Sequence, residues 1–425
     1  MAITIRFPSL FLRKRHSAKE CERVLGQFRE WKIPQQSLPE PRTVTDTLLI
    51  IRLDDIGDYV LFRNQLVAYR NSPRWKNHRI TLLGNSSWKD LFALLDHDTV
   101  HDVIWVNKGD YLESAAYRLQ IWDLLRAKGF ETVIAPSRTR PLLLDDLCML
   151  AAAPRSNLGS ANTYVHASWN ALSDGLYQQL FRPGSEFIHE FEFNAQFAGW
   201  VCGAEFVAPR LEIDYPFVAP SSQPYIICFI GANTRSKRWP RKRWIAFIRA
   251  YQRKHSGTIL VAGASKSEQL AAHAIQARTG AESIAGKASL ADMAAWIACA
   301  QAVITNDTMA AHVGAACGRP TVIIANGVNY SRFTEYARLG MNRVATLYPE
   351  FFNRRRARRG EHAYHYADAV SADIASIQAI RVLTELERVM ASEAPLDDAM
   401  SAVGEAAPGA DRDSLNVASD GLRAN

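Results

Sequence analysis

Three groups of polar and charged residues, each placed after a run of apolar residues, have the composition of a reaction site. The first, residues 52–58 with the sequence RLDDIGD, follows the apolar run that begins at Thr47. Gly57 allows a tight backbone turn, and Asp58 stands at the expected start of a helix. A carboxylate there can remove a proton from an acceptor hydroxyl, which is general-base catalysis. The alternative is that Asp58 is only the N-cap of that helix.

The second group, residues 231–240 with the sequence GANTRSKRWP, follows the apolar run 225–230. It combines small residues with the Thr234 hydroxyl and with cations that include Lys237 and Arg238. Hydroxyl groups, cations and backbone N–H groups at a strand-to-helix turn are typical of a phosphate-binding loop. The alternative is an exposed basic loop, and the position after a buried strand favours phosphate binding.

The third group, residues 305–312 with the sequence TNDTMAAH, also follows an expected strand and opens a helix. Backbone N–H groups at a helix start favour an anion, and Thr308 adds a hydroxyl. Asp307 either binds sugar hydroxyls or caps the helix. His312 lies one turn inside the helix, where a structural histidine is the plainer interpretation.

The elements that must position these groups alternate between strands and helices. Apolar runs predict strands at 47–53, 79–83, 103–106, 132–135, 225–230, 258–262, 302–305 and 321–325. Helical patterns between them include 58–69, 112–128, 242–254 and 308–317. This alternation implies parallel sheets with right-handed crossovers. The fold class is therefore α/β, with two Rossmann-like doubly wound domains facing a central cleft. That is the GT-B architecture of nucleotide-sugar glycosyltransferases. Some dehydrogenases and epimerases also have two doubly wound domains that face a cleft.

The chain divides at the Pro- and Ser-rich segment 215–224. We predict a basic extension at 1–45, an acceptor domain at 46–218, a nucleotide-sugar domain at 219–390 and a disordered acidic tail at 391–425. The net charge is +7; residues 1–45 carry nine Lys/Arg and four Glu, and residues 391–425 carry two Arg and seven Asp/Glu. The basic middle suits an anionic partner. A helix at 17–31 either packs on the body or, with the apolar and basic residues 7–15, lies on a membrane surface.

Composition excludes several classes of protein. An apolar fraction of 48% and a charged fraction of 22% are ordinary for a globular chain. No run is long and apolar enough for a membrane span, and the start lacks the pattern of a signal peptide. Six scattered cysteines without a C-x-x-C pair argue against a disulfide framework or structural zinc, and fit a reducing cytosol. Two D-x-D triplets, at 96–98 and 411–413, fall in an expected turn and in the tail, so no metal site is predicted.

Four segments, in order, resemble glycosyltransferase family 9, the heptosyltransferases of lipopolysaccharide synthesis. The resemblance covers roughly residues 46–390. It is carried by LIIRLDDIGD at 49–58, by KRWP at 237–240 with Arg243 and Trp244, by IAGKASL at 284–290, and by NDT at 306–308 with His312 and AACGRPT at 315–321. Each segment is weak alone, and the four in register make the assignment strong.

The resemblance implies a role for each matched residue. Asp58 matches the proposed catalytic base, and Thr234 and Lys237 match positions that hold the donor phosphates. Glu268 falls near the acidic residue that contacts the ribose, and Asp307, Thr308 and His312 match donor-binding positions. Met309 stands where the family usually has Gly, and residues 353–360, NRRRARRG, replace a usual Cys-bearing segment.

These observations predict an inverting, metal-independent glycosyltransferase that moves heptose from ADP-heptose to a hydroxyl of a lipopolysaccharide core or related surface glycan. The nucleotide sugar is a substrate, and no cofactor is expected. Lys237, Arg238, Thr234 and the N–H groups near Thr308 would neutralise the departing diphosphate. The partners are the nucleotide sugar, a glycolipid or oligosaccharide acceptor and an anionic membrane surface, with no nucleic acid. The expected location is the cytoplasm, at the inner face of the inner membrane.

Three alternatives stay open at this point. Met309 keeps open another nucleotide sugar for O-antigen or capsule. A homologue that binds glycan or nucleotide without turnover would keep the same fold, although Asp58, Lys237 and Asp307 together speak against it. A nicotinamide oxidoreductase is disfavoured because the sequence lacks a G-x-G-x-x-G fingerprint.

The arginine run 354–359 is interpreted as a solvated loop or as a docking surface for anionic lipid or phosphorylated sugar.

Overall fold

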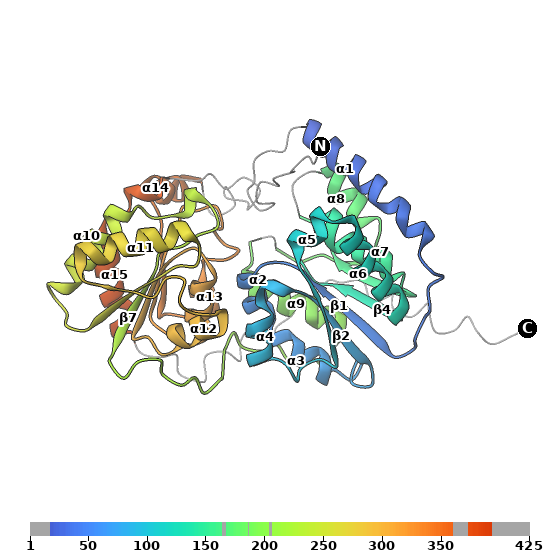
Figure 1. The fold of residues 1–425 in the computed structure, drawn as a ribbon, viewed down its shortest axis with the longest axis horizontal. Helices are drawn as coiled ribbons and strands as arrows, with labels where there is room; N and C mark the ends of the chain where they lie inside the picture. The colour runs from blue at the N-terminus through green and yellow to red at the C-terminus, as the bar shows by residue number, and fades with distance from the viewer. Residues whose placement is uncertain (1–17, 164–166, 186, 204–205, 360–372, 393–425) are drawn as a thin grey trace, which may run out of the picture. The chain divides into compact units, whose positions relative to one another are not determined.

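The computed structural model describes residues 18–163, 167–185, 187–203, 206–359 and 373–392 (Figure 1). It contains two six-stranded sheets, and every strand pair in both is parallel. The two Rossmann-like α/β halves expected from the alternation of strands and helices are therefore confirmed. The predicted tail at 391–425 lies almost wholly outside the described residues, and the domain boundaries stay predictions.

The first sheet has the strand order β3-β2-β1-β4-β5-β6. Its central strand β1 is buried at every residue, and Ile50 lies opposite Leu82 of β2 and Ile134 of β4. Such a run, apolar on both faces, is typical of a parallel sheet covered by helices. The strands are β1 Thr47–Arg52, β2 Arg79–Asn85, β3 Asp102–Val106, β4 Thr132–Ala135, β5 Ser156–Ser160 and β6 Gln179–Phe181.

The helices of the first half lie between and after these strands. They are α2 Ile56–Phe62, α3 Asn64–Asn71, α4 Lys89–Leu95, α5 Lys108–Glu113, α6 Ala115–Lys128, α7 Leu147–Ala152, α8 Ala167–Asp174 and α9 Glu190–Cys202. Short turns of helix are η1 Ile33–Ser37, η2 Ser86–Trp88 and η3 Leu142–Asp146.

The second sheet has the order β12-β11-β10-β7-β8-β9, which repeats the topology of the first. The strands are β7 Tyr225–Phe229, β8 Thr258–Ala262, β9 Glu282–Ser283, β10 Ala302–Asn306, β11 Thr321–Ile324 and β12 Val344–Leu347. The helices are α10 Arg241–Gln252, α11 Lys266–Thr279, α12 Leu290–Ala298, α13 Met309–Ala316, α14 Glu350–Arg359 and α15 Ala379–Ala391. Short helical turns are η4 Arg235–Lys237, η5 Tyr336–Leu339 and η7 Ile374–Ser376.

Both sheets reverse their strand order beside their first strand, between β1 and β4 and between β7 and β10. In open α/β sheets, ligands bind outside the carboxyl ends of the strands at such a switch point. The three polar groups singled out in the sequence follow β1, β7 and β10. The topology therefore places all three at the two switch points.

Two expected helices are each divided in the structure. The helix predicted at 58–69 begins earlier and is split at Arg63 into α2 and α3. The helix predicted at 112–128 is divided at Ser114, whose backbone is extended and whose side chain accepts the Tyr117 N–H to cap α6. A serine hydroxyl competes for backbone donors in this way, which makes it a frequent helix start.

The N-terminal helix α1, Ala18–Lys32, packs on the first half. Val24 and Phe28 are buried in the same core as Leu144 and Leu147, and the Arg118 guanidinium lies 3.6 Å from the centre of the Trp31 ring. This favours the packed interpretation of the helix over the membrane-surface one. The basic and apolar residues 7–15 lie outside the described residues.

The arginine run is not a loop, because residues 354–359 belong to helix α14. Cys148 of α7 and Cys228 of β7 are fully buried free thiols, one in the core of each half. Across the described residues, none of the helices has the length and apolar character needed to cross a membrane.

Candidate active site

A cavity of about 710 Å³ lies at the switch points of both sheets. Its lining comes from segments that follow strands of both sheets, namely β1, β2, β4, β7, β8, β9, β10 and β11. The polar and charged lining residues include Asp55, Asp58, Thr139, Thr234, Lys237, Glu268, Asp307, Thr308, His312, Asn329 and Arg332. The structure thus brings together seven of the eight residues selected from the sequence, and their roles stay predictions. Arg238 is not part of the lining.

Asp58 lies in the first turn of α2 and is not its N-cap. Asp55 holds the N-cap position in extended backbone, and its side chain makes no capping hydrogen bond. The capping alternative for Asp58 is therefore wrong. Burial raises the Asp58 pKa from its ordinary value to about 6, against the lowering effect of Arg332 and Arg52. A carboxyl poised there is mostly ionised at neutral pH and is basic enough to accept a proton.

The buried guanidinium of Arg52 fixes the loop that carries Asp58. Its Nε donates to Asp54 Oδ1 at 3.0 Å, and its terminal nitrogens donate to Asn194 Oδ1 at 3.2 Å and to the Asp58 carbonyl at 3.4 Å. Because Arg52 ends β1 and Asn194 belongs to α9, these contacts tie the loop to rigid elements. The position of Asp58 is therefore set by the sheet and not by the loop alone.

Lys237 and Asp307 meet across the second switch point. Lys237 Nζ lies 3.0 Å from Asp307 Oδ2, which also accepts a hydrogen bond from Asn329 Nδ2 at 2.8 Å. Thr308 is the N-cap of α13, and its hydroxyl contacts Thr305 Oγ1 at 3.2 Å instead of capping the helix. A cation and a helix start without a side-chain cap face the same cavity, which suits an anionic ligand.

Glu268 is bound by backbone N–H groups. Its carboxylate accepts hydrogen bonds from the N–H groups of Ala232 at 3.3 Å, Ala264 at 2.8 Å and Ser265 at 3.0 Å. With Ser265 it forms the capping box of α11. A Cβ on Gly231 or Gly263 would come within 2.8 Å of Glu268, so both glycines are needed for its close fit. The S-x-x-E pattern at 265–268 was available in the sequence as a sign of this cap.

Arg238 supports the loop after β7 from outside the cavity. Its Nε donates to the Ala232 carbonyl at 2.9 Å, and a terminal nitrogen lies 3.7 Å from Glu268 Oε1. Lys237, one residue earlier, faces the cavity. The two neighbouring cations therefore have different surroundings, which the sequence pattern could not separate.

His312 is buried and neutral at physiological pH. Burial lowers its pKa to about 4, and its Nδ1 is hydrogen-bonded to the Tyr336 hydroxyl. Its ring contacts α2 closely, because a Cβ on Gly57 would lie 2.7 Å from His312 Cδ2. His312 therefore packs against the start of the helix that carries Asp58.

The predictions from the sequence did not include the buried ion pair of Arg332 and Glu190. Arg332 lies in the segment after β11, and its guanidinium binds the Glu190 carboxylate of α9 at 2.6 and 3.2 Å. Both side chains are almost completely buried, and Arg332 lines the cavity. The only signal for Arg332 was that it follows a central strand of the second sheet.

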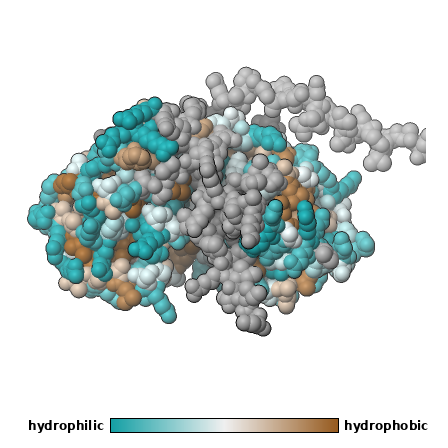
Figure 2. Space-filling view, turned by 90° about the horizontal axis from the view of Figure 1, so that it is seen from above, coloured by the Kyte–Doolittle hydropathy of each residue, from teal (hydrophilic) through white to brown (hydrophobic). Residues whose placement is uncertain are grey.

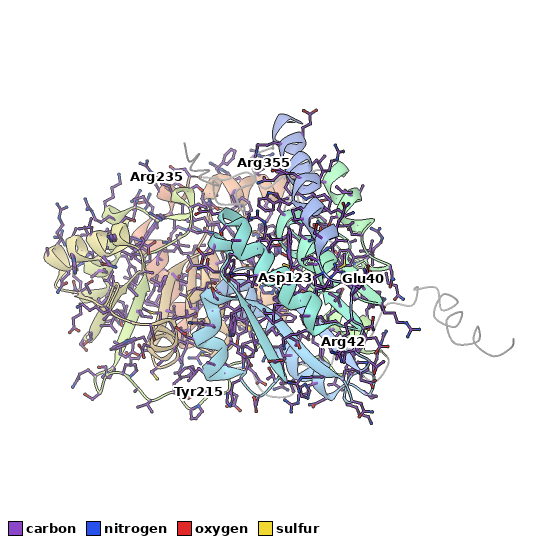
Figure 3. All side chains as sticks on the ribbon, turned by 45° about the vertical axis from the view of Figure 1, so that its right-hand side comes forward. Glu40, Arg42, Asp123, Tyr215, Arg235 and Arg355 are labelled. Atoms are coloured by element: carbon purple, nitrogen blue, oxygen red, sulfur yellow. The ribbon has the colours of Figure 1, made fainter. Side chains whose placement is uncertain are left out.

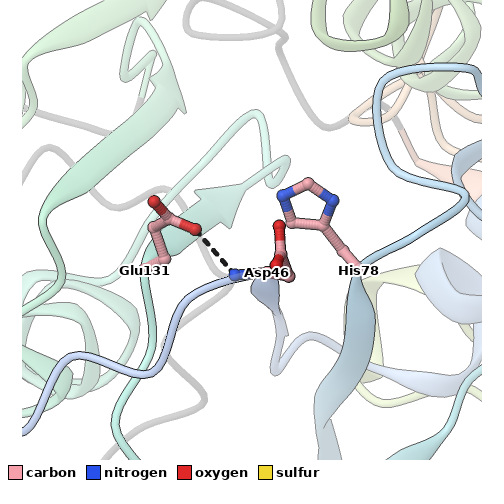
Figure 4. Close-up of side chains that lie close together, drawn as sticks. All are labelled: Asp46, His78 and Glu131. Carbon is pink, nitrogen blue, oxygen red and sulfur yellow. Dashed lines mark hydrogen bonds between the residues drawn. The ribbon is translucent and has the colours of Figure 1, made fainter.

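A group of potential metal ligands lies outside the candidate active site. Asp46, His78 and Glu131 place one ligand atom each within 4.8 Å of one another (Figure 4). The Asp46 N–H also donates to Glu131 Oε2 at 2.8 Å. These residues precede β1, β2 and β4, so the cluster lies at the amino ends of the strands, away from the cavity.

Asp96 of the first D-x-D triplet is bound by Arg63 at 2.8 Å and by the Tyr59 hydroxyl, which occupies its oxygens.

Comparisons with solved structures define the architecture. The fold is similar to a glycosyltransferase family 9 protein from Veillonella parvula, with TM-score 0.62 and 16% identity over 81% of this chain and 97% of that chain. E. coli ADP-heptose heptosyltransferase II gives 0.57 and 17% over 81% and 98%. E. coli heptosyltransferase WaaC with ADP gives 0.60 and 15% over 81% and 99%. The architecture is that of the GT-B glycosyltransferases.

A family model matches part of the second half of the chain. Residues 204–341 match the model of glycosyltransferase family 9 (heptosyltransferase). This match agrees with the resemblance that the four sequence segments carry. A search of curated proteins gives no match.

Proposed function

We propose that this chain is an inverting glycosyltransferase that moves heptose from ADP-heptose to a hydroxyl of a lipopolysaccharide core or related surface glycan. The observation that carries the proposal is one cavity that joins a carboxyl group of raised pKa, Asp58, to the cationic and N–H-rich segments after β7 and β10. The first group suits an acceptor hydroxyl, and the second suits the diphosphate of a nucleotide sugar.

Asp58 acts as the general base. Its carboxylate takes the proton of the acceptor hydroxyl as that oxygen attacks the anomeric carbon and the bond to the diphosphate breaks. Attack from the side opposite the leaving group inverts the anomeric centre. Arg52 holds the backbone of the Asp58 loop, so the carboxylate meets the acceptor in a fixed position.

Lys237, Thr234 and the first turn of α13 receive the negative charge of the departing diphosphate. Fixed cations and N–H dipoles stabilise a leaving group without reorganising during the reaction. Lys237 is held by Asp307 at 3.0 Å, and a diphosphate would compete with that carboxylate for the ammonium. Arg238 contributes by supporting the loop, since it does not line the cavity.

Turnover is proposed to need no divalent metal. The charge of the leaving group is met by Lys237 and helix α13, and the first D-x-D triplet is committed to a structural contact with Arg63. Added EDTA should therefore leave nucleotide release nearly unchanged. Loss of turnover in EDTA that Mg²⁺ or Mn²⁺ restores would contradict this part of the proposal.

Met309 affects the identity of the donor in this proposal. Met309 lines the cavity at the point where the family usually has Gly, so a donor other than ADP-heptose is the second candidate. A thermal-shift panel of ADP-, UDP- and GDP-sugars, followed by nucleotide release with each, decides between them. A donor at 100 times its Kd stabilises the fold by about 2.7 kcal/mol. Stabilisation by every donor without release from any would favour a silent binding protein.

The acceptor is proposed to reach the cavity from an anionic membrane surface. Helix α14 anchors through Phe352, which is buried against Tyr330, and Arg356 lies over the Tyr330 ring at 5.3 Å. Val328, Asn329 and Arg332 of the same segment line the cavity. Arg355 of α14 and Arg235 of η4 both appear at the upper edge of the molecule in Figure 3. Figure 2, which views the molecule from above, shows hydrophilic and hydrophobic side chains mixed on this face.

A further inference from the structure

Arg332 is carried by the second half of the chain and yet lines the cavity together with Asp58 of the first half. It follows β11, and its backbone carbonyl accepts the Glu190 N–H of α9 at 2.8 Å. Its guanidinium binds the Glu190 carboxylate at 2.6 and 3.2 Å and lies 3.5 Å from Thr139 Oγ1. Three separate contacts therefore fix the position of this cation.

The Glu190 partner links the pair to the loop that carries Asp58. Glu190 is fully buried and lies 3.8 Å from a terminal nitrogen of Arg52. Arg52 in turn donates to the Asp58 carbonyl at 3.4 Å. A continuous chain of charged groups thus runs from Arg332 through Glu190 and Arg52 to the backbone of Asp58.

We infer that Arg332 is a positioning residue that keeps the Asp58 carboxylate ionised and ready to accept a proton, with Glu190 as the opposing charge that limits this effect. The inference rests on the proposed role of Asp58 as general base. It adds that the second half, which binds the donor in our proposal, also supplies the charge that prepares the base in the first half.

The charged surroundings of Asp58 support this assignment. Arg332 has the largest lowering effect on the Asp58 pKa, Glu190 raises it, Arg52 lowers it and Asp55 raises it. Asp54 is a further carboxyl close by, and it is held by Arg52 at 2.9 Å. The two histidines on the elements packed against α2 are uncharged near neutral pH, because burial lowers the pKa of His312 to about 4 and that of His189 to about 3. The charge balance at Asp58 therefore depends on Arg332 more than on any other cation.

The test is the pH dependence of kcat/KM for variants of opposite charge effect. Arg332→Gln removes the cation, so the acidic limb should move to higher pH by about half a unit or more. Glu190→Gln removes the like charge, so the limb should move to lower pH. Arg332→Lys keeps the charge and should leave the limb near its original position. Movement in opposite directions is not expected from loss of structure alone, because a loosened site lowers the rate without a consistent sign in the limb.

Removing one partner of a buried ion pair leaves the other unpaired and can unfold the chain. The double variant Arg332→Gln with Glu190→Gln avoids this, and its limb should lie between those of the single variants. Arg338→Gln is the matched control. Arg338 also joins the halves, through a 2.6 Å hydrogen bond to the Phe187 carbonyl, but it is not among the charges that act on Asp58. Its limb should not move.

The outcomes separate this inference from the proposed function. If Asp58→Asn keeps near-native turnover, the proposed base is wrong and the inference falls with it. If Asp58→Asn is inactive while the limbs of the Arg332 and Glu190 variants stay in place, only the inference is overturned. A fall in kcat/KM for Arg332→Gln at every pH, with no movement of the limb, would mean that Arg332 contacts substrate instead, which also overturns it.

Discussion

Among single residues, Asp58 decides the proposed mechanism, because the proposal makes it the general base. Asp55 takes the N-cap position, so Asp58 is left in the first turn of α2 with its carboxyl in the cavity wall. Asp58→Asn should keep donor affinity and lose turnover by about 10²–10⁴-fold, the usual contribution of a general base. Nucleotide release under single-turnover conditions measures this, with donor binding by thermal shift as the control. Near-native turnover would make Asp55 or Asp54 the next candidate.

The raised pKa of Asp58 also makes the free energy of unfolding depend on pH. A carboxyl whose pKa rises from 3.8 to about 6 on folding binds its proton more tightly in the folded state. It therefore costs stability as the pH rises from about 4 to about 6, by up to about 3 kcal/mol at roughly 1.4 kcal/mol per pKa unit. Asp58→Asn should be at least as stable as the native chain at pH 8, and that advantage should disappear below pH 4. Chemical unfolding at both pH values checks this, and a variant that is less stable at pH 8 would contradict it.

Among the elements, α2 and α13 pack closely against each other at the candidate site. A Cβ on Gly57 would lie 2.7 Å from His312 Cδ2, and the His312 ring is held by Tyr336 and cannot turn away freely. Gly57→Ala should therefore cost about 1–3 kcal/mol of stability and lower kcat/KM, because overpacking pushes the two helices apart.

The control for this change is Gly184→Ala, since no atom lies within 4 Å of the added Cβ there. It should leave both the melting temperature and the rate unchanged. Combining Gly57→Ala with His312→Ala should restore stability without restoring the rate. If Gly57→Ala behaves like Gly184→Ala, the close approach of the two helices has no functional weight.

The central strands could be predicted far better than the boundaries of the helices. Runs such as 47–52 and 225–229 are apolar on both faces, and only a buried parallel strand accepts that pattern. The break at Ser114 depends on a local hydrogen bond, and the break at Arg63 occurs where its side chain binds Asp96 and the Glu212 carbonyl. Asp96 and Glu212 are distant from Arg63 in the sequence, so periodicity could not reveal the break at Arg63.

The residues of the candidate site that follow central strands could be predicted, and those that depend on contacts between distant segments could not. Motifs that follow central strands fall at one edge of a sheet, which placed Asp58, Lys237 and Asp307 around one cavity. Arg332 and Glu190 belong to no motif, and they meet only because the segment after β11 comes together with the start of α9 in three dimensions. Arg238 shows the opposite limit, because a residue inside a motif can point away from the cavity.

For the molecule as a whole, helix α14 carries a run of basic residues on the surface. Helix α14 presents Arg354 and Arg358 to solvent beside the exposed Phe351, and the segment behind it lines the cavity. We expect reversible, salt-sensitive binding to vesicles that contain phosphatidylglycerol, at about 1 kcal/mol per basic residue near the surface. Co-sedimentation with and without added salt, and with phosphatidylcholine vesicles in parallel, measures it.

Arg354→Ala with Arg358→Ala should weaken this binding without changing nucleotide release from a soluble acceptor. Arg241→Ala with Lys242→Ala removes two exposed cations from α10 and serves as the matched control. Equal losses in both double variants would mean that net charge, and not helix α14, drives the association. Binding that is unaffected by salt would contradict an electrostatic mechanism altogether.

The two fully buried thiols, Cys148 and Cys228, give each half of the chain its own reporter of unfolding. Cys148 and Cys228 have no access to water, and burial raises the pKa of both thiols. Because the thiolate is the reactive form, neither should react with an alkylating reagent until the surrounding core opens. Pulsed alkylation followed by peptide mapping would therefore time the opening of the first half at Cys148 and of the second at Cys228. Equal rates would show that the two sheets unfold as one cooperative unit, and unequal rates would show which half gives way first.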